Sequence, residues 1–193
     1  GQSGAFAGTM APITDGLDDH IEVIQGLNGN LYVSSEQSDS VLEYTTAGAL
    51  VRTFVAAGSG GLNGSAGMAF GPDGHLYVAG YLGNQVLRYD GSTGAFLGVA
   101  VSSGTAGFGT PLGLNFGPDG MLYVVSRANN SIMRFDAETG AHDASFSGSL
   151  PSGNLEDFTF GPDGNLYAAD GNRVARINGS TGTFIDNFVT SGA

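Results

Sequence analysis

The sequence contains no cysteine, no lysine and no tryptophan. The absence of cysteine excludes disulfide bonds, thiolate metal sites and cysteine nucleophiles. Basic charge is also scarce, because six arginines stand against 18 aspartates and glutamates, giving a formal net charge of -12. Such a surface repels nucleic acid and anionic lipid, so we expect neither as a partner. No apolar run is long enough to span a bilayer, and we expect neither a membrane span nor a signal peptide in the chain as given.

The 193 residues suffice for one domain with a sizeable core. Glycine is abundant, with 34 residues, but it is interspersed with Val, Ile, Leu, Phe and Tyr, which argues against a disordered low-complexity chain. The acidic composition without lysine, rich in Gly, Ser, Asn and Thr, favours an extracellular, secreted prokaryotic protein.

A tetrapeptide repeats along the chain and defines its period. Gly-Pro-Asp-Gly occurs at 71–74, 117–120 and 161–164, and Gly-Leu-Asn-Gly stands at the matching place, 26–29, so the four copies begin 45, 46 and 44 residues apart. Each copy is followed by a Leu-Tyr pair and small or β-branched residues, which predicts a hairpin turn followed by a strand.

Three further strands per period are predicted around this turn. One precedes it, one follows about twelve residues after the Leu-Tyr strand, and one leaves a second turn such as Asp90-Gly91-Ser92-Thr93-Gly94. Four antiparallel strands in about 45 residues are typical of a propeller blade. We therefore predict an all-β protein, a β-propeller or an open array of blades, with four four-stranded blades at about 16–61, 62–107, 108–150 and 151–193.

Residues 1–15 hold one strand more than four blades need. Gly4, Ala5, Phe6, Ala7 and Gly8 match 94–98, a fourth strand, yet blade 4 already has its own at 183–189. The extra strand belongs to a longer propeller, adds a fifth strand to one blade, or pairs with a neighbouring subunit. The last alternative predicts a homo-oligomer or head-to-tail filament formed by this segment with Phe184, Ile185 and Phe188.

The Gly-Pro-Asp-Gly-x-Leu-Tyr-Val phrase and the closing Val-x-Arg-Tyr-Asp resemble NHL-type repeats and the related propellers of the virginiamycin B lyase and gluconolactonase kind. The resemblance covers residues 16–193. It implies histidine and glutamate chemistry on the axial face, as in the lyases, or a calcium ion held by Glu, Asn and Asp, as in the lactonases. The nearest equivalents are Glu22, Glu156 and Asp157, whereas Gly67 and Gly113 fill the matching places in blades 2 and 3. Solvated polar residues at a channel mouth are the simpler interpretation.

Asp15, Asp18 and Asp19 form a second acidic group that could bind calcium, but they lack the spacing of an EF-hand loop, and an exposed turn is the preferred interpretation. The three histidines, His20, His75 and His142, fall on different strand types and are not expected to converge. The repeated turn aspartates are expected to bond their own backbone, and Asp39, Asn84, Asn130 and Asn172 are expected to fix one loop per blade.

No nucleophile elbow, phosphate-binding loop or His-Glu-x-x-His motif is present. The favoured hypothesis is therefore a non-catalytic structural or binding scaffold that self-associates. The alternative is part of a lyase- or lactonase-type enzyme with an axial metal site. A binding platform for a peptide or glycan on the blade tops is a third hypothesis.

Overall fold

A computed structural model describes residues 16–150 and 154–190, except for the side chain of His20. These residues form four antiparallel sheets, and each sheet is one blade. Blade 1 consists of β1 (His20–Gln25), β2 (Leu31–Ser35), β3 (Ser40–Tyr44) and β4 (Leu50–Val55). Blade 2 consists of β5 (Ser65–Phe70), β6 (Leu76–Gly80), β7 (Gln85–Tyr89) and β8 (Phe96–Val101). Blade 3 consists of β9 (Pro111–Phe116), β10 (Leu122–Ser126), β11 (Ser131–Phe135) and β12 (Gly148–Ser149), and blade 4 of β13 (Leu155–Phe160), β14 (Leu166–Asp170), β15 (Arg173–Ile177) and β16 (Phe184–Val189).

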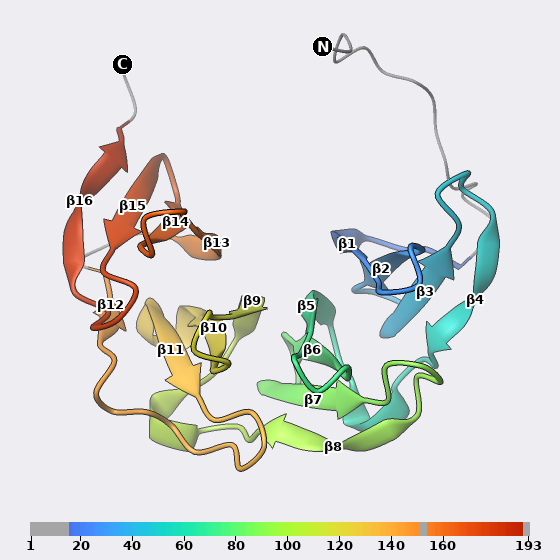
Figure 1. Ribbon diagram of the computed structural model, residues 1–193. Helices are drawn as coiled ribbons and strands as arrows, with labels where there is room; N and C mark the ends of the chain where they lie inside the picture. Colours follow the sequence, from blue (N-terminus) through green and yellow to red (C-terminus); the bar gives the residue numbers. More distant parts are fainter. Residues whose placement is uncertain (1–15, 151–153, 191–193) are drawn as a thin grey trace, which may run out of the picture.

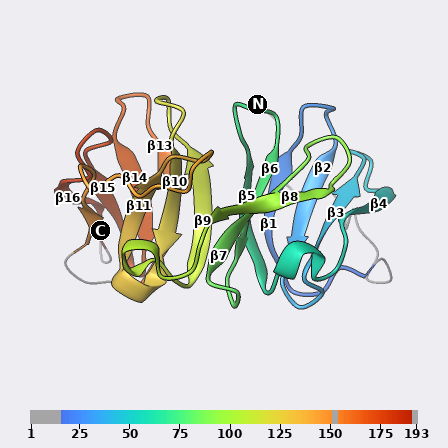
Figure 2. The ribbon, with the colours of Figure 1, turned by 90° about the horizontal axis from the view of Figure 1, so that it is seen from below.

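The blades follow one another around an arc that is open between blade 1 and blade 4 (Figure 1). The first strand of each blade lies toward the centre and the fourth lies toward the rim, as the sequence predicted. Seen from below, the strands near the axis stand upright, whereas β8 lies across them at the rim (Figure 2). This change of direction is the ordinary twist of a four-stranded sheet. The predicted all-β propeller architecture is confirmed, and in the described residues it forms an open arc.

The repeated turns have the predicted conformation. The last glycine of each tetrapeptide has a positive φ, with values from 76° to 82°, which side chains with a Cβ rarely adopt. Asp73, Asp119 and Asp163 each accept a hydrogen bond from the backbone N–H two residues later. Their second carboxylate oxygen also accepts one from the tyrosine hydroxyl of the following strand, which the sequence did not predict. The turn is therefore tied to the strand that it feeds.

Aromatic residues join each blade to the next. The ring of Tyr32 in blade 1 receives the edge of Phe70 from blade 2 at 5.1 Å, and Tyr77 and Tyr123 receive Phe116 and Phe160 in the same way at 5.0 Å. Leucine, valine and methionine side chains fill the rest of each interface. Each interface is thus a repeated copy of one packing scheme, in which the tyrosine that recurs once per repeat packs against the next blade.

Loop residues in left-handed conformation also link neighbouring blades. The side-chain oxygen of Asp39 accepts a hydrogen bond from Gly64 N at 2.6 Å, and that of Asn84 accepts one from Thr110 N at 2.7 Å. Asn130 donates to the Leu150 carbonyl at 3.3 Å. In each case one blade fixes the segment that enters the next. Asn172 differs, because the neighbouring Gly171 takes the positive φ in its loop.

The fourth strand of blade 3 is the least regular of the four, since β12 spans two residues and pairs with Ser131 and Ile132. His142 forms a separate bridge to Phe135. Three short 3₁₀ turns, η1 (Ser59–Gly61), η2 (Thr105–Gly107) and η3 (Arg127–Asn129), complete the described structure. Within the ranges described, no helix is long and apolar enough to cross a membrane. The predicted strand at 4–8 lies outside the described residues.

Candidate functional site

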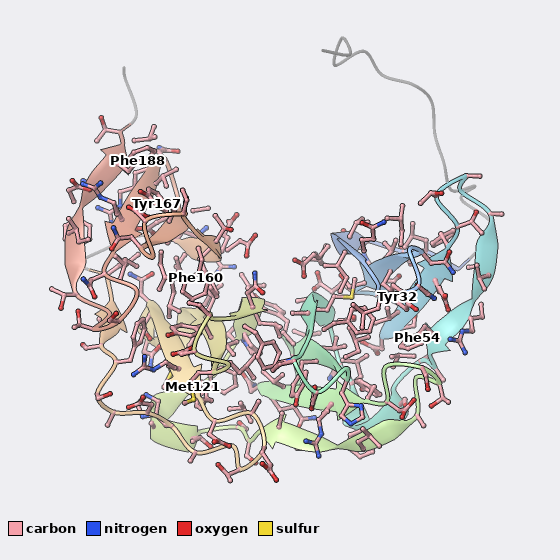
Figure 3. All side chains as sticks on the ribbon, in the orientation of Figure 1. Tyr32, Phe54, Met121, Phe160, Tyr167 and Phe188 are labelled. Carbon is pink, nitrogen blue, oxygen red and sulfur yellow. The ribbon has the colours of Figure 1, made fainter. Side chains whose placement is uncertain are left out.

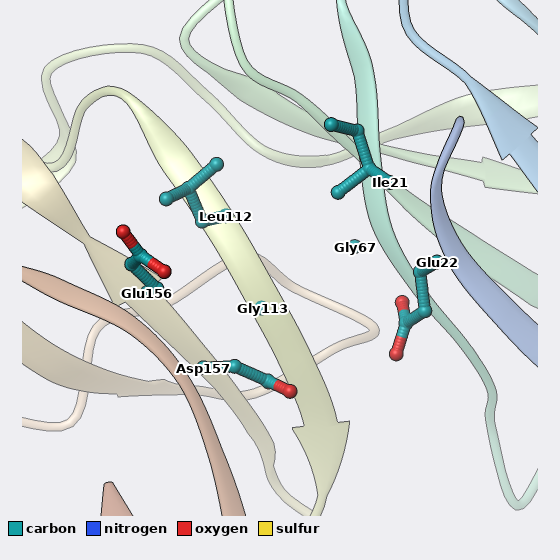
Figure 4. A pocket seen from close by; sticks show the side chains of 7 residues that line it. All are labelled: Ile21, Glu22, Gly67, Leu112, Gly113, Glu156 and Asp157. Atoms are coloured by element: carbon teal, nitrogen blue, oxygen red, sulfur yellow. The ribbon is translucent and has the colours of Figure 1, made fainter. Parts of the chain in front are cut away.

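A pocket of about 350 Å³ opens where the first strands of the four blades approach one another (Figure 4). All of its walls come from β1, β5, β9 and β13. Its lining combines acidic, apolar and glycine positions: Ile21, Glu22, Gly67, Leu112, Gly113, Glu156 and Asp157. The three acidic residues that the resemblance implied for the axial face thus line one pocket.

Two glycines form the floor between the acids. A Cβ on Gly67 would collide with the Leu112 carbonyl of β9, and a Cβ on Gly113 would collide with the carboxyl group of Asp157 on β13. The neighbouring first strands therefore lie too close for any larger residue at these places. At this position blades 1 to 4 carry an acid, a glycine, a glycine and an acid. The pattern follows from the close approach, because only the first strands of blades 1 and 4 have room for a side chain here.

Glu22 enters the pocket from β1 and is anchored to blade 2. Its Oε2 accepts a hydrogen bond from Met68 N at 2.5 Å, while its own backbone N–H donates to Ser34 Oγ at 2.9 Å. Burial raises the pKa of Glu22 to about 7, against the lowering effect of the Met68 bond, and the negative charge of Asp157 raises it further. Glu22 therefore exchanges a proton near neutral pH.

Asp157 enters the same pocket from β13, at the other end of the arc. Its Oδ1 lies over Gly113 and accepts a hydrogen bond from Phe158 N at 2.8 Å. Burial of the carboxyl group raises its pKa, and the Phe158 bond opposes the shift. Figure 4 shows Glu22 and Asp157 on opposite walls of the pocket. The first and last blades therefore each contribute one carboxyl group with a raised pKa.

Glu156 occupies the outer wall and is exposed. Its Oε1 accepts a hydrogen bond from Asn154 Nδ2 at 2.9 Å, and the other end of that amide is bonded by Arg127 of blade 3. Asn154, which enters the first strand of blade 4, thus orients Glu156.

Chemically, the pocket can hold and release a proton or attract a cationic group, because two carboxyl groups face a partly apolar space. In the described ranges, no three His, Asp or Glu side chains lie close enough together to bind a metal ion. Calcium therefore stays a prediction from the resemblance, with Glu22 and Asp157 as the oxygen ligands that the pocket offers.

The other predicted site residues lie apart from this pocket. Asp18 and Asp19 are exposed; the backbone N–H of Asp18 donates to Ser35 Oγ, and Asp19 accepts a hydrogen bond from Gln37. Asp15 and the segment Gly4, Ala5, Phe6, Ala7, Gly8 lie outside the described residues. His75 lies between blades 2 and 3, whereas the ring of His142 contacts Phe135 at 5.5 Å.

Sequence reasoning missed a second feature, the open face of blade 4. Tyr167 and Phe188 lie there, at the end of the arc, with ring centroids 4.9 Å apart (Figure 3). Tyr167 stands where Tyr32, Tyr77 and Tyr123 are almost fully buried by the following blade, but Phe188 beside it is 58% exposed. Ala169 is exposed and Val174 half-buried on the same face. The repeat alignment contained the signal, since blade 4 keeps the interface residues of blades 1 to 3.

No family model and no curated protein sequence matches the chain. Solved structures do match. Virginiamycin B lyase from Staphylococcus aureus superposes with a TM-score of 0.69 and 19% identity over 92% of this chain and 57% of the lyase. A putative gluconolactonase has a TM-score of 0.63 and 19% identity over 90% of this chain and 60% of its own.

A protein of unknown function from Bacteroides caccae gives a TM-score of 0.63 and 18% identity, over 89% of this chain and 61% of that one. The chain therefore spans about three fifths of the length of these structures. At this identity the comparison shows the fold, a propeller shared by the lyase and by proteins of unknown function, and the resemblance seen in the sequence is confirmed at that level.

Proposed function

We propose that this chain is a secreted structural module of propeller blades that self-associates through blade 4, without catalysis. The observation that carries the proposal is the exposure of Phe188, with Ala169, on a face whose counterparts are buried in three successive interfaces. Burying apolar surface of this kind stabilises association by roughly 25 cal/mol per Å² before the entropic cost of binding is subtracted.

The partner is a second copy of this chain, bound head to tail. In the internal interfaces, Met68, Leu114 and Phe158 lie on the face that each blade turns to its predecessor. Val23 holds this position in blade 1 and is exposed, beside exposed Ile21. A second copy can therefore bring the axial half of its blade 1 against blade 4. Such a heterologous contact leads to open chains rather than closed dimers.

The edge of blade 4 offers a second route to the same assembly. β16 has one paired neighbour, β15, among the residues described. Ile185 is exposed on it, while Phe184 packs toward blade 3. The segment 4–8 of another copy would extend this sheet by main-chain hydrogen bonds, as the surplus strand predicted.

The experiment is light scattering of the purified chain over a concentration series, with electron microscopy of the same samples. We expect masses that rise in multiples of the 19.5 kDa chain. Phe188→Asp should lower the association by placing a charge in the contact. Leu97→Asp is the matched control, because Leu97 is an equally apolar, exposed residue on the outer strand of an interior blade.

Deletion of residues 1–10 separates the two routes. If strand donation drives assembly, the deletion abolishes it while Phe188→Asp weakens it. If the blade faces drive assembly, the order of the two effects is reversed. A monodisperse particle of single-chain mass at every concentration overturns the proposal.

The axial pocket favours one alternative, an enzyme of the lyase or lactonase kind. A glutamate with a pKa of about 7 beside a second carboxyl group is suited to donate or accept a proton. A solved structure of an inactive virginiamycin B lyase contains quinupristin, and another similar structure is a putative gluconolactonase. Under this alternative the chain therefore consumes quinupristin or a sugar lactone, assayed by mass spectrometry with and without calcium, and Glu22→Gln removes the activity. Turnover that depends on Glu22 would replace the scaffold proposal, and its absence supports that proposal.

A further inference from the structure

Three blades carry an ion pair between the third strand and the segment beside it, which is the fourth strand in blades 1 and 4 and the stretch before β12 in blade 3. Glu43 pairs with Arg52 at 2.7 Å in blade 1, Arg134 with Asp143 at 2.6 Å in blade 3, and Arg176 with Asp186 at 2.5 Å in blade 4. The sign is reversed in blade 1, but the place is the same. A charge on the third strand is thus matched by an opposite charge opposite it on the sheet.

Blade 2 lacks this pair. Arg88 stands at the third-strand position, and its cross-strand partner on β8 is Gly98. An added Cβ at Gly98 would meet no atom within 4 Å, so the space beside it is open. Among the described residues, Arg88 has no acidic partner within ion-pair distance, and its side chain interacts instead with the hydroxyl group of Tyr77. The chain has 18 acidic residues and six arginines, yet the third-strand arginine of blade 2 has no carboxylate opposite it.

A second contact is missing at the same place. Arg52 donates to the carbonyl of Ser92 in the turn of blade 2 at 2.8 Å, and Arg134 donates to that of Ser180 in the turn of blade 4. Each arginine thereby ties the following blade to its own. Glu138 holds the corresponding place in the turn of blade 3, and no hydrogen bond from Arg88 reaches its carbonyl within the described structure.

A pocket of about 510 Å³ lies where these contacts are missing, between blades 2 and 3. Arg88 and His75 line it from blade 2, together with Asp73 and the buried Tyr77, and Glu138 lines it from blade 3. Tyr77 donates its hydroxyl hydrogen to Asp73 at 2.8 Å, which fixes that wall. The pocket lies at the interface between two blades and shares no residue with the axial pocket.

We propose that this pocket binds a small hydroxylated carboxylate, of the hexuronic acid class, with the ligand's carboxylate on Arg88. The guanidinium is a planar fork of donors that matches a carboxylate in two parallel hydrogen bonds. The ligand thereby supplies the anion that Asp143 supplies to Arg134 in blade 3 and Asp186 supplies to Arg176 in blade 4. His75 offers a further donor, and the carboxylates of Asp73 and Glu138 accept hydrogen bonds from ligand hydroxyls.

The test is a titration of the isotope-labelled chain with D-glucuronate, followed by amide chemical shifts. We expect saturable shifts at Arg88 and in the turn 136–138, and no such shifts with D-glucose, which lacks the carboxylate. Arg88→Gln should weaken binding by about tenfold or more, because a charge-assisted pair is lost. Arg176→Gln is the matched control, since it removes the arginine at the same repeat position in blade 4, and it should bind as the parent does.

A second variant places the missing anion within the chain. Gly98→Asp places a carboxylate opposite Arg88, as Asp186 stands opposite Arg176 in blade 4, and should abolish glucuronate binding. The φ of Gly98 is 157°, where a side chain strains the backbone, so the amide spectrum of the variant is first checked for the parent fold. If Gly98→Asp does not fold, Arg88→Gln decides alone. Equal binding of glucose and glucuronate, full affinity in Arg88→Gln, or no saturable shift with glucuronate would each overturn the proposal. None of these outcomes bears on self-association through blade 4.

Discussion

Blade 1 and blade 4 both border the opening of the arc, but their apolar faces there differ in exposure. On blade 1, Val33, Leu42 and Tyr44 are buried within the chain, with Leu17 packed against them. On blade 4, Phe188 and Ala169 stay exposed and Tyr167 is only partly covered. The part of the blade 1 face that lies on β2 and β3 is thus closed, whereas Val23 and Ile21 on β1 and the face of blade 4 stay exposed. These exposed surfaces are the ones available for a partner.

The largest effect should come from truncation at the closed face. Leu42→Ala removes a side chain that is 1% exposed and should lower the free energy of unfolding by about 3 to 4 kcal/mol. Phe188→Ala, at the open face, should cost less than about 1 kcal/mol, because little burial is lost. Urea denaturation below the association concentration measures both. Equal losses of unfolding free energy in the two variants would mean that blade 1 and blade 4 do not differ in burial at the opening of the arc.

The next largest effect should come from the axial pocket, which is lined by Glu22 of blade 1 and Asp157 of blade 4. The folded-state pKa of Glu22, about 7, lies above its ordinary value, so its contribution to stability is complete below pH 4.5 and is lost as pH rises through 7. The loss should be roughly 2 to 3 kcal/mol. Glu22→Gln should remove this part of the pH dependence and be more stable than the parent at pH 8.

Denaturation midpoints of the parent and of Glu22→Gln between pH 4 and 8 measure the difference. Glu156→Gln serves as control, because it changes an exposed carboxylate on the same pocket wall. If the stability of the parent and of Glu22→Gln changes with pH in the same way, Glu22 does not titrate with a raised pKa in the axial pocket.

A matched pair of valines sharpens the contrast between the interior and the open end. Val86 and Val174 occupy the same third-strand position, but Val86 is fully buried against blade 3 and Val174 is half-buried. Val86→Ala should cost about 2 kcal/mol, and Val174→Ala under about 1 kcal/mol. The difference should shrink at concentrations where the chain self-associates. A difference that stays constant with concentration would argue against blade 4 as the contact.

The smallest effect involves the arginines of blades 3 and 4. Arg134 pairs with Asp143, lies over the rings of Phe146 and Tyr123, and bonds to the turn of blade 4. Arg176 pairs with Asp186 at the open end and has no following blade to tie. Arg134→Gln should lower stability by about 1 kcal/mol, and Arg176→Gln should leave the denaturation midpoint unchanged. Identical midpoints for the two variants would contradict a role in joining blades.

Local chemistry made most of the fold predictable. A proline that presets φ and an aspartate that bonds its own turn recur in blades 2 to 4, and a glycine with positive φ ends the turn in all four blades. Each hairpin could therefore be placed from the sequence. Tyr32, Tyr77 and Tyr123 could be assigned to blade interfaces from their period alone. The short fourth strand β12 could not be predicted, because nothing in the stretch 141–147 distinguishes a fourth strand from a loop.

The axial site was only partly predictable. Glu22 and Asp157 were candidates, but they lie 135 positions apart in the chain, and their meeting depends on the curvature summed over three interfaces. That Arg88 has no acidic partner among the described residues was likewise hidden, because Arg88 follows the consensus of its repeat. Its distinction lies in Gly98 on the opposite strand, and the register between the two strands is known only from the structure.

Gly67 and Gly113 set how sharply the arc bends. Because a Cβ at either place would strike the adjacent first strand, these glycines let neighbouring blades converge at the axis more closely than at the rim. The size of the side chain at this position therefore limits how closely the first strands of blades 2, 3 and 4 approach one another. A larger residue there would push these strands apart and open the arc further.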